Sequence, residues 1–330
     1  MKIGFSRSLS RALRSQKKFV RLVEAVLQPP RRRRTRKGPP RLEMTMSFGS
    51  NPGRLVMKFF APPKLPERPS MVVVLHGCGQ TPESLDAASG FSRLARERGF
   101  VVVYPEQSKS NNPQGCFNWF RPSSVSRDRG ELLSVRQMIE HAGKRYGVDR
   151  KRVFVVGLSA GGAMTAVLVA TYPDLFAGAA IVAGMPVGAA REAMSALRAM
   201  RSGAPTPAEG WGSRIAGISP ERRSWPSISI WHGTADSVVN PKNANASVDQ
   251  WLEAMNINRE SSHIQKKAWG ELHSWRTAHG SSLTFYSVAN LAHGLPVKPR
   301  ASDRSNPKDP FVLASDVSAP LELMRLWGLS

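Results

Sequence analysis

The chain has 330 residues and is 41% hydrophobic, which is enough for a sizeable globular core, and it has no run of about 18 apolar residues, which excludes a membrane-spanning helix. The formal net charge of +23 suggests a nucleic-acid-binding protein at first sight, but residues 1–41 hold 14 Lys and Arg against one acid, Glu24. This segment therefore carries more than half of the net charge. The other residues are only moderately basic, so the total charge does not by itself predict a nucleic-acid partner.

Residues 1–41 form an N-terminal appendage in our interpretation. Apolar residues such as Leu9 and Leu13 recur among Arg and Lys over residues 1–28, which indicates a basic amphipathic helix, and the Pro- and Arg-rich residues 29–40 predict a solvated linker. No smooth hydrophobic segment follows the first charges, so an ordinary secretory signal is only weakly supported, and a processed leader and a cytoplasmic location both stay open. Two interpretations stay open: a disordered basic tail, or a segment that binds an anionic lipid or nucleic-acid surface weakly.

The domain formed by residues 42–330 alternates short apolar runs with segments of helical periodicity. We predict strands over Arg54–Phe60, Met71–Leu75, Phe100–Tyr104, Ala179–Ala183, Ile228–Trp231 and Leu283–Val288, and helices over Phe91–Arg98, over Leu132–Tyr146 and from about Asn243. This alternation predicts an α/β fold with a mainly parallel sheet, helices on both faces, and a site beyond the carboxyl ends of the strands. Residues 186–225 interrupt the pattern and are expected to form either an insertion over the site or a surface excursion.

An apolar run from Val153 is stopped by the sequence GLSAG at residues 157–161 and followed at once by small and apolar residues. A serine hydroxyl is a weak nucleophile, and a sharp strand-to-helix turn would expose Ser159 and direct the amide of Ala160 toward a reacting carbonyl. The simpler alternative is a buried strand followed by a glycine-rich helix start. The strand and helix patterns on the two sides favour the catalytic interpretation.

A catalytic serine needs a base and an acid that orients it, and both are expected on loops that follow later strands. Asp236 lies on the loop that follows the strand Ile228–Trp231, and His293 follows the last core strand. Asp236 could instead be a solvated loop residue or a helix N-cap. His232 also closes a strand, but its glycine neighbour suggests that it shapes a loop. The order Ser159, Asp236, His293 is the order expected of an α/β-hydrolase.

The stretch HGCGQ after the strand Met71–Leu75 stands where an oxyanion hole needs its second backbone N–H group. We expect the amide of Cys78 to fill this role beside that of Ala160. Cys78 and Cys116 lack metal-ligand spacing, and spacing alone leaves a disulfide and two buried thiols equally open.

Five separated motifs, HGCGQT, YPEQSKSNNPQGCFNWF, GLSAGGAMT, HGTAD and AHGLPV, resemble the catalytic domain of polyhydroxybutyrate depolymerase esterases over roughly residues 50–328. That family is similar to feruloyl and acetylxylan esterases and uses a serine acyl-enzyme. The resemblance implies that Ser159 is the nucleophile, Asp236 the orienting acid and His293 the base. It also implies a disulfide between Cys78 and Cys116 and an extracellular or periplasmic location.

The function expected from these patterns is the hydrolysis of carboxylic esters, with poly- or oligo-3-hydroxyalkanoates as substrates and feruloyl or acetylxylan esters as the alternative. Trp119 and Trp231 become candidates to line the acyl or alcohol pocket, with the alternative that they belong to the core, as large aromatic residues near strand ends more often do. We expect no metal or organic cofactor. The hypothesis from another class is a non-catalytic scaffold that binds polyanions through residues 1–41.

Overall fold

The computed structural model describes residues 42–220, 222, 224–277, 280–299 and 309–329. Arg41–Ser330 is one compact unit, and the appendage predicted over residues 1–41 lies outside the described residues. In the described part of the chain, no helix has the length and apolar character needed to cross a membrane.

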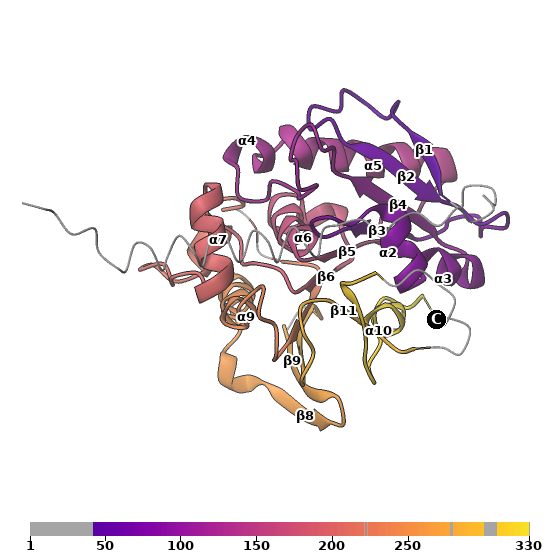
Figure 1. The fold of residues 1–330 in the computed structure, drawn as a ribbon. Coiled ribbons are helices and arrows are strands. Elements are labelled where there is room, and N and C mark those ends of the chain that lie inside the picture. Colours follow the sequence, from indigo (N-terminus) through magenta and orange to yellow (C-terminus); the bar gives the residue numbers. More distant parts are fainter. Residues whose placement is uncertain (1–41, 221, 223, 278–279, 300–308, 330) are drawn as a thin grey trace, which may run out of the picture. The chain divides into compact units, whose positions relative to one another are not determined.

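Ten strands of the described residues form one sheet in the order β1-β2-β4-β3-β5-β6-β7-β10-β9-β8 (Figure 1). The six strands from β4 to β10 pair in parallel, whereas β1, β2, β9 and β8 extend the two edges in antiparallel pairing. The predicted mainly parallel sheet is thereby confirmed. The bounds are β1 Glu43–Thr45, β2 Val56–Phe60, β3 Met71–Leu75, β4 Val101–Glu106, β5 Val153–Leu158, β6 Gly178–Val182, β7 Ser227–Gly233, β8 His263–Lys267, β9 Gly270–Arg276 and β10 Ser282–Val288; β11 Leu295–Val297 and β12 Val312–Ala314 pair separately.

The parallel strands at the centre of the sheet are buried on both faces, and successive side chains of each strand point into opposite cores. In β3, Met71, Val73 and Leu75 pack into one core and Val72 and Val74 into the other. Helices α5, α6 and α9 line the first core, and α2, α3 and α10 line the second. The helices are α2 Pro82–Ser89, α3 Phe91–Arg98, α4 Pro122–Val125, α5 Gly130–Tyr146, α6 Ala160–Thr171, α7 Ala193–Ser202, α8 Gly212–Ala216, α9 Lys242–Met255 and α10 Ala319–Leu326, with 3-10 helices at Pro173–Leu175 and Arg259–Ser261.

The segment expected as an insertion, residues 186–225, contains α7 and α8. Helix α8 packs along α9, and the Met200 carbonyl in α7 accepts a hydrogen bond of 2.7 Å from the Asn240 amide. The inserted segment therefore contacts the loop that follows β7, the loop that carries Asp236.

Candidate active site

Ser159 is the single residue between the end of β5 and the first residue of α6, and its backbone angles are φ 56° and ψ −118°. Residues other than glycine rarely adopt positive φ, because the Cβ atom then crowds the backbone. The turn is held on both sides: the Ser159 amide donates to the Val182 carbonyl at 2.8 Å, and the Ser159 carbonyl accepts from the Ala163 amide at 2.9 Å. The strand-to-helix turn predicted from GLSAG is therefore present and is strained at the serine.

The two glycines of GLSAG are required by close backbone contacts. A Cβ atom on Gly157 would lie 2.1 Å from the Gly161 carbonyl oxygen, and one on Gly161 would lie 2.4 Å from the Leu75 carbonyl oxygen. The first neighbour belongs to helix α6 and the second to strand β3, so neither can move aside without displacing a core element. The glycine spacing thus brings the start of α6 against the end of β3, the strand that opens into HGCGQ.

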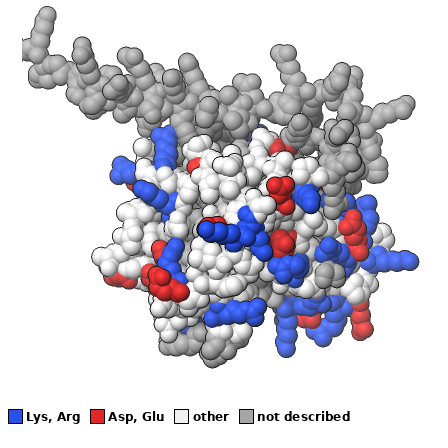
Figure 2. Space-filling view, turned by 90° about the horizontal axis from the view of Figure 1, so that it is seen from below, with Lys and Arg blue, Asp and Glu red and all other residues white. Residues whose placement is uncertain are grey.

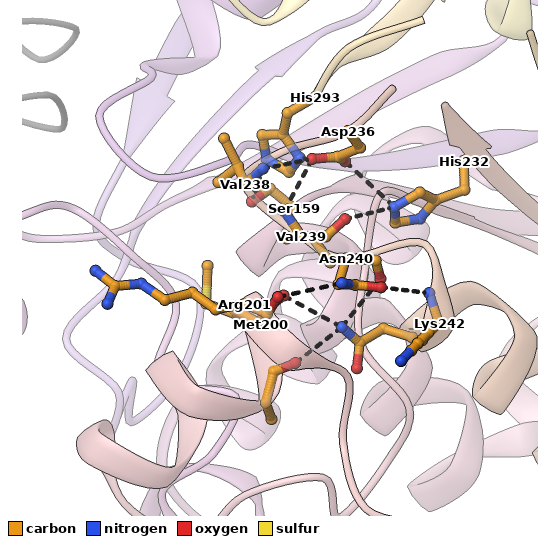
Figure 3. Close-up of polar contacts among 12 residues, drawn as sticks. Ser159, Met200, Arg201, His232, Asp236, Val238, Val239, Asn240, Lys242 and His293 are labelled. Carbon is orange, nitrogen blue, oxygen red and sulfur yellow. Dashed lines mark hydrogen bonds and ion pairs between the residues drawn. The ribbon is translucent and has the colours of Figure 1, made fainter. Parts of the chain in front are cut away.

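The three polar residues predicted to act together meet at the carboxyl ends of β5, β7 and β10 (Figure 3). Ser159 Oγ lies 2.9 Å from His293 Nε2, and His293 Nδ1 lies 2.7 Å from Asp236 Oδ2. A carboxylate only accepts hydrogen bonds, so Nδ1 carries the proton and Nε2 is left to accept the serine proton. This arrangement can remove the proton from Ser159 and hold it on an imidazole beside a negative charge.

The carboxylate of Asp236 is buried and receives hydrogen bonds on both oxygens. Oδ1 accepts from the amides of Val238 and Val239 at 2.9 and 2.8 Å, and Oδ2 accepts from His232 Nε2 at 3.2 Å as well as from His293. Burial alone would raise the pKa of Asp236, but the hydrogen bonds from His232 and His293 outweigh it and hold the pKa well below its usual range. The carboxylate is therefore ionised throughout the neutral range.

The HGCGQ loop lies beside the serine, since a Cβ atom on Gly77 would be 3.4 Å from the Ser159 Cβ. Among the described residues, no hydrogen bond uses the amide of Cys78 or of Ala160. A disulfide joins Cys78 to Cys116, with 4.3 Å between the two Cα atoms, and the Gly79 amide donates to the Gln114 carbonyl at 2.9 Å. The disulfide that the family resemblance implied is confirmed, and it ties the HGCGQ loop to residues 114–116.

Comparison with known proteins identifies the family, since residues 55–265 match the family model described as esterase PHB depolymerase. The chain belongs to this family. It is 37% identical over 292 residues to poly(3-hydroxyalkanoate) depolymerase C of Paucimonas lemoignei, covering 87% of this chain and 70% of that protein. It is also 28% identical over 263 residues to feruloyl esterase B of Talaromyces stipitatus, covering 77% of this chain and 72% of that protein.

A solved structure of acetyl xylan esterase from Aspergillus awamori superposes with a TM-score of 0.73 at 24% identity, over 88% of this chain and 99% of that chain. This likeness shows the fold, an α/β-hydrolase fold, as the alternation of elements predicted. Together with the family match, it identifies the protein as a serine esterase that acts on carboxylic esters.

His76 supports the HGCGQ loop of this esterase as a neutral residue. Its Nε2 accepts from the Gln107 amide at 3.1 Å, so Nδ1 carries the proton and donates to the Gly77 carbonyl at 2.8 Å. Burial is the dominant effect and lowers the pKa of His76 to about 4. The Gln107 side chain continues the support, because its Nε2 donates to the Cys116 carbonyl at 3.1 Å and to Glu131 Oε1 at 2.9 Å.

The two tryptophans predicted to line the substrate pocket differ in position. Trp231 is fully buried and stacks on Tyr286 with 3.5 Å between ring centroids, in the core lined by α10. The assignment of Trp231 to the substrate pocket is therefore wrong, because the alternation of β7 turns its ring into the core. Trp119 is 7% exposed and packs edge-on against Phe120 at 5.5 Å. A role of Trp119 in substrate binding stays a prediction.

The sequence interpretation missed the part played by His232, which it assigned to loop shaping. The signal was present in HGTAD, where a histidine precedes the acid by four residues. No group of three or more His, Cys, Asp or Glu residues suited to a metal ion occurs in the portion of the chain that the structure describes.

Proposed function

We propose that Ser159 is the nucleophile of this esterase, His293 its general base and Asp236 the acid that orients His293. The observation that carries the proposal is the unbroken chain of contacts from Asp236 Oδ2 through His293 to Ser159 Oγ, at 2.7 and 2.9 Å. Both ends of the chain are fixed, the serine by its strained turn and the carboxylate by backbone amides. Such geometry places the reacting groups before substrate arrives.

The reaction proceeds in two steps. In the first, Ser159 Oγ attacks the ester carbonyl as His293 Nε2 takes the hydroxyl proton; the carbonyl electrons move to oxygen and then return as the alcohol leaves with the proton from His293. In the second, His293 removes a proton from water, the hydroxide attacks the acyl-enzyme, and the acid leaves as Ser159 regains its proton. The amides of Cys78 and Ala160 stabilise the oxyanion in both steps.

The proposed substrates are poly- or oligo-3-hydroxyalkanoate esters, since the match to a poly(3-hydroxyalkanoate) depolymerase covers most of the chain at 37% identity. Feruloyl and acetylxylan esters are the alternative, favoured by the matches to esterases of those names. A panel of hydroxybutyrate oligomers, polymer granules, feruloyl esters and acetylated xylan, ranked by kcat/KM, separates them. A ranking led by feruloyl or acetyl esters would replace the first substrate class with the second.

The catalytic assignment is tested by labelling the protein with a fluorophosphonate and by replacing Ser159 with alanine. The label should attach to Ser159, and Ser159→Ala should lower turnover by roughly 10⁶-fold, as loss of a catalytic serine does elsewhere. Ser110→Ala, which changes an exposed serine, is the matched control and should keep full turnover. Labelling at another residue, or an active Ser159→Ala variant, would remove the assignment.

We also propose that the protein is located outside the cytoplasm. This location is supported by the Cys78–Cys116 disulfide, because such bonds persist mainly in oxidising compartments. Fractionation of the native cells with an antibody to the protein is the test, and detection confined to the cytoplasm would contradict it.

Weak binding of residues 1–41 to anionic surfaces is proposed from their composition alone. On the face shown in Figure 2, Lys and Arg side chains lie scattered among Asp and Glu rather than in one basic patch, so that face of the domain offers no comparable surface. Removing residues 1–41 should leave turnover on a soluble ester unchanged and abolish adsorption to anionic vesicles. Adsorption that does not weaken with added salt would contradict an electrostatic origin.

A further inference from the structure

His232 lies beside the site but has no role in the proposed reaction. It contacts the same oxygen of Asp236 as His293 does. His232 Nε2 lies 3.2 Å from Asp236 Oδ2 and 2.9 Å from the Val239 carbonyl oxygen. Both oxygens can only accept, so Nε2 carries a proton and donates to both. Oδ2 therefore receives N–H groups from two imidazoles, one on each side of the carboxylate (Figure 3).

The position of His232 follows from the alternation of β7. Ile228 and Ile230 pack into the core lined by α9, so His232 continues on that face, while Trp231 points to the other. The chain then turns back, with the Ala235 amide donating to the Leu291 carbonyl at 3.1 Å. This return brings the carboxyl group four residues on to the imidazole of His232.

We propose that His232 is a positioning residue for the catalytic step, which fixes the carboxylate of Asp236 in the plane that His293 requires. This inference rests on the proposed function of Ser159, His293 and Asp236. The amides of Val238 and Val239 bind Oδ1, so among the described residues His232 is the contact of Oδ2 other than the catalytic His293. The same hydrogen bond draws charge from Oδ2, the oxygen that would otherwise stabilise a protonated His293.

The surroundings of His232 allow its effect on pH dependence to be isolated. Its side chain lines a cavity of about 470 Å³ that also contains Arg259 and Glu260 from the 3-10 helix and Glu271 and His273 from β9. Glu271 lies 3.2 Å from His273, and Arg259 pairs with Asp249 on α9. Glu260 is the remaining charged residue that lines the cavity. Residues of α9 and its N-cap that line the cavity, Pro241 and Asn245, are uncharged.

The experiment compares His232→Leu with His232→Gln, whose side-chain amide can place an N–H group where Nε2 stands. Rates on a soluble 4-nitrophenyl ester are measured from about pH 5 to about pH 9 and divided by the fraction of sites that a fluorophosphonate titrates. We expect His232→Leu to lower kcat by roughly 10- to 100-fold, the usual cost of losing a group that orients a functional residue, with KM nearly unchanged.

The pH profile separates positioning from a merely structural role. Without His232, Oδ2 interacts with His293 alone and stabilises the protonated form of His293 more strongly. The low-pH side of the kcat/KM profile, its acid limb, should therefore move to higher pH in His232→Leu. His232→Gln should restore both kcat and the limb. His273→Leu is the matched control, because His273 lines the same cavity and contacts Glu271 but no residue of the proposed triad.

Two results would overturn the inference. One is a His232→Leu variant whose titrated sites turn over at the wild-type rate; the other is a loss of rate with an unmoved acid limb that His232→Gln does not restore. Either result leaves the proposed function intact as long as Ser159→Ala is inactive. An active Ser159→Ala variant would instead reject the proposed function itself.

Discussion

The acid loop, residues 232–240, and the oxyanion loop, residues 76–80, are both fixed beside Ser159, but by different kinds of bond. In the acid loop, two backbone amides and two imidazoles donate hydrogen bonds to the buried carboxylate of Asp236. In the oxyanion loop, a disulfide from Cys78, the neutral imidazole of His76 and the side-chain amide of Gln80 hold the backbone. The carboxylate of Asp309 takes part only indirectly, by accepting a hydrogen bond of 2.8 Å from Gln80 Nε2.

This difference matches what each loop contributes. A loop that supplies charge must satisfy that charge wherever it is buried, so its own hydrogen bonds depend on ionisation. A loop that supplies only backbone N–H groups needs rigidity, which a covalent link and neutral hydrogen bonds provide at any ionic strength. Removing the groups that hold each loop should therefore affect turnover and stability differently in the two loops.

The largest expected effect comes from removing the charge of Asp236 while keeping its shape. The amides of Val238 and Val239 require an oxygen acceptor at Oδ1, so Asp236→Asn places its NH₂ group toward His293. That group would donate to Nδ1 and leave the proton on Nε2, the tautomer that cannot accept from Ser159. We expect kcat to fall by roughly 10⁴-fold, as in serine proteases with this change.

The measurement is single-substrate kinetics on a soluble ester, with a thermal melt to show that the variant is folded. Asp249→Asn is the control, since Asp249 is an exposed partner of Arg259 away from the triad, and its kcat should stay near the wild-type value. A value for Asp236→Asn within about tenfold of wild type would mean that the acid loop does not set the tautomer.

The second effect is a loss of stability, expected when the disulfide is replaced in a Cys78→Ser, Cys116→Ser double variant. The link closes a loop with a sequence separation of 38, for which chain entropy predicts a cost of about 4 kcal/mol. The Tm should fall by roughly 10 °C. Thermal denaturation of the variant is compared with that of reduced wild-type protein, and the two should agree.

Turnover of this double variant should fall as well, but less than in Asp236→Asn. The hydrogen bond from Gly79 to Gln114 and the contacts of His76 still hold the oxyanion loop. An unchanged Tm would show that these contacts alone fix the loop, and the contrast between the two loops would then disappear.

Sequence alone predicted the parts of the site that depend on short-range constraints. The turn at Ser159 is specified by glycines that exclude a Cβ atom, and Asp236 and His293 follow apolar runs that end at the same edge of a parallel sheet. The polar strand β8, with the sequence HIQKK and mostly exposed side chains, has no apolar alternation and was not predicted.

The errors concern which face of a strand a side chain occupies. Trp231 and His232 are neighbours at the end of β7, and the sequence placed the first at the pocket and the second in a loop-shaping role. In the structure, Trp231 packs on Tyr286 in the core, and His232 is the residue that contacts Asp236 at the site. The alternation of side chains from Ile228 and Ile230 predicts which face of the sheet Trp231 and His232 occupy. That prediction requires knowing that β7 is a central strand with β6 and β10 on its two sides.

The smallest expected effect is a difference in the pH at which each loop loses stability. Burial lowers the pKa of His76 to about 4 from 6.5, so between these values the unfolded chain binds more protons than the folded one. Stability falls as the pH drops through this window, by up to about 3 kcal/mol. The folded pKa of Asp236 is lowered, so its contribution is present above its unfolded pKa of 3.8 and is lost only at lower pH.

Denaturant unfolding at about pH 7, 5 and 4 measures the His76 window, and a further measurement at about pH 3 measures the Asp236 window. His76→Asn keeps an N–H donor for the Gly77 carbonyl and removes the titrating ring, so the variant should be less stable at neutral pH but lose less stability down to about pH 4. Its unfolding below that pH should still steepen, because Asp236 is unchanged. A His76→Asn variant with the wild-type slope between pH 6.5 and 4 would show that the acid sensitivity of this window arises outside the oxyanion loop.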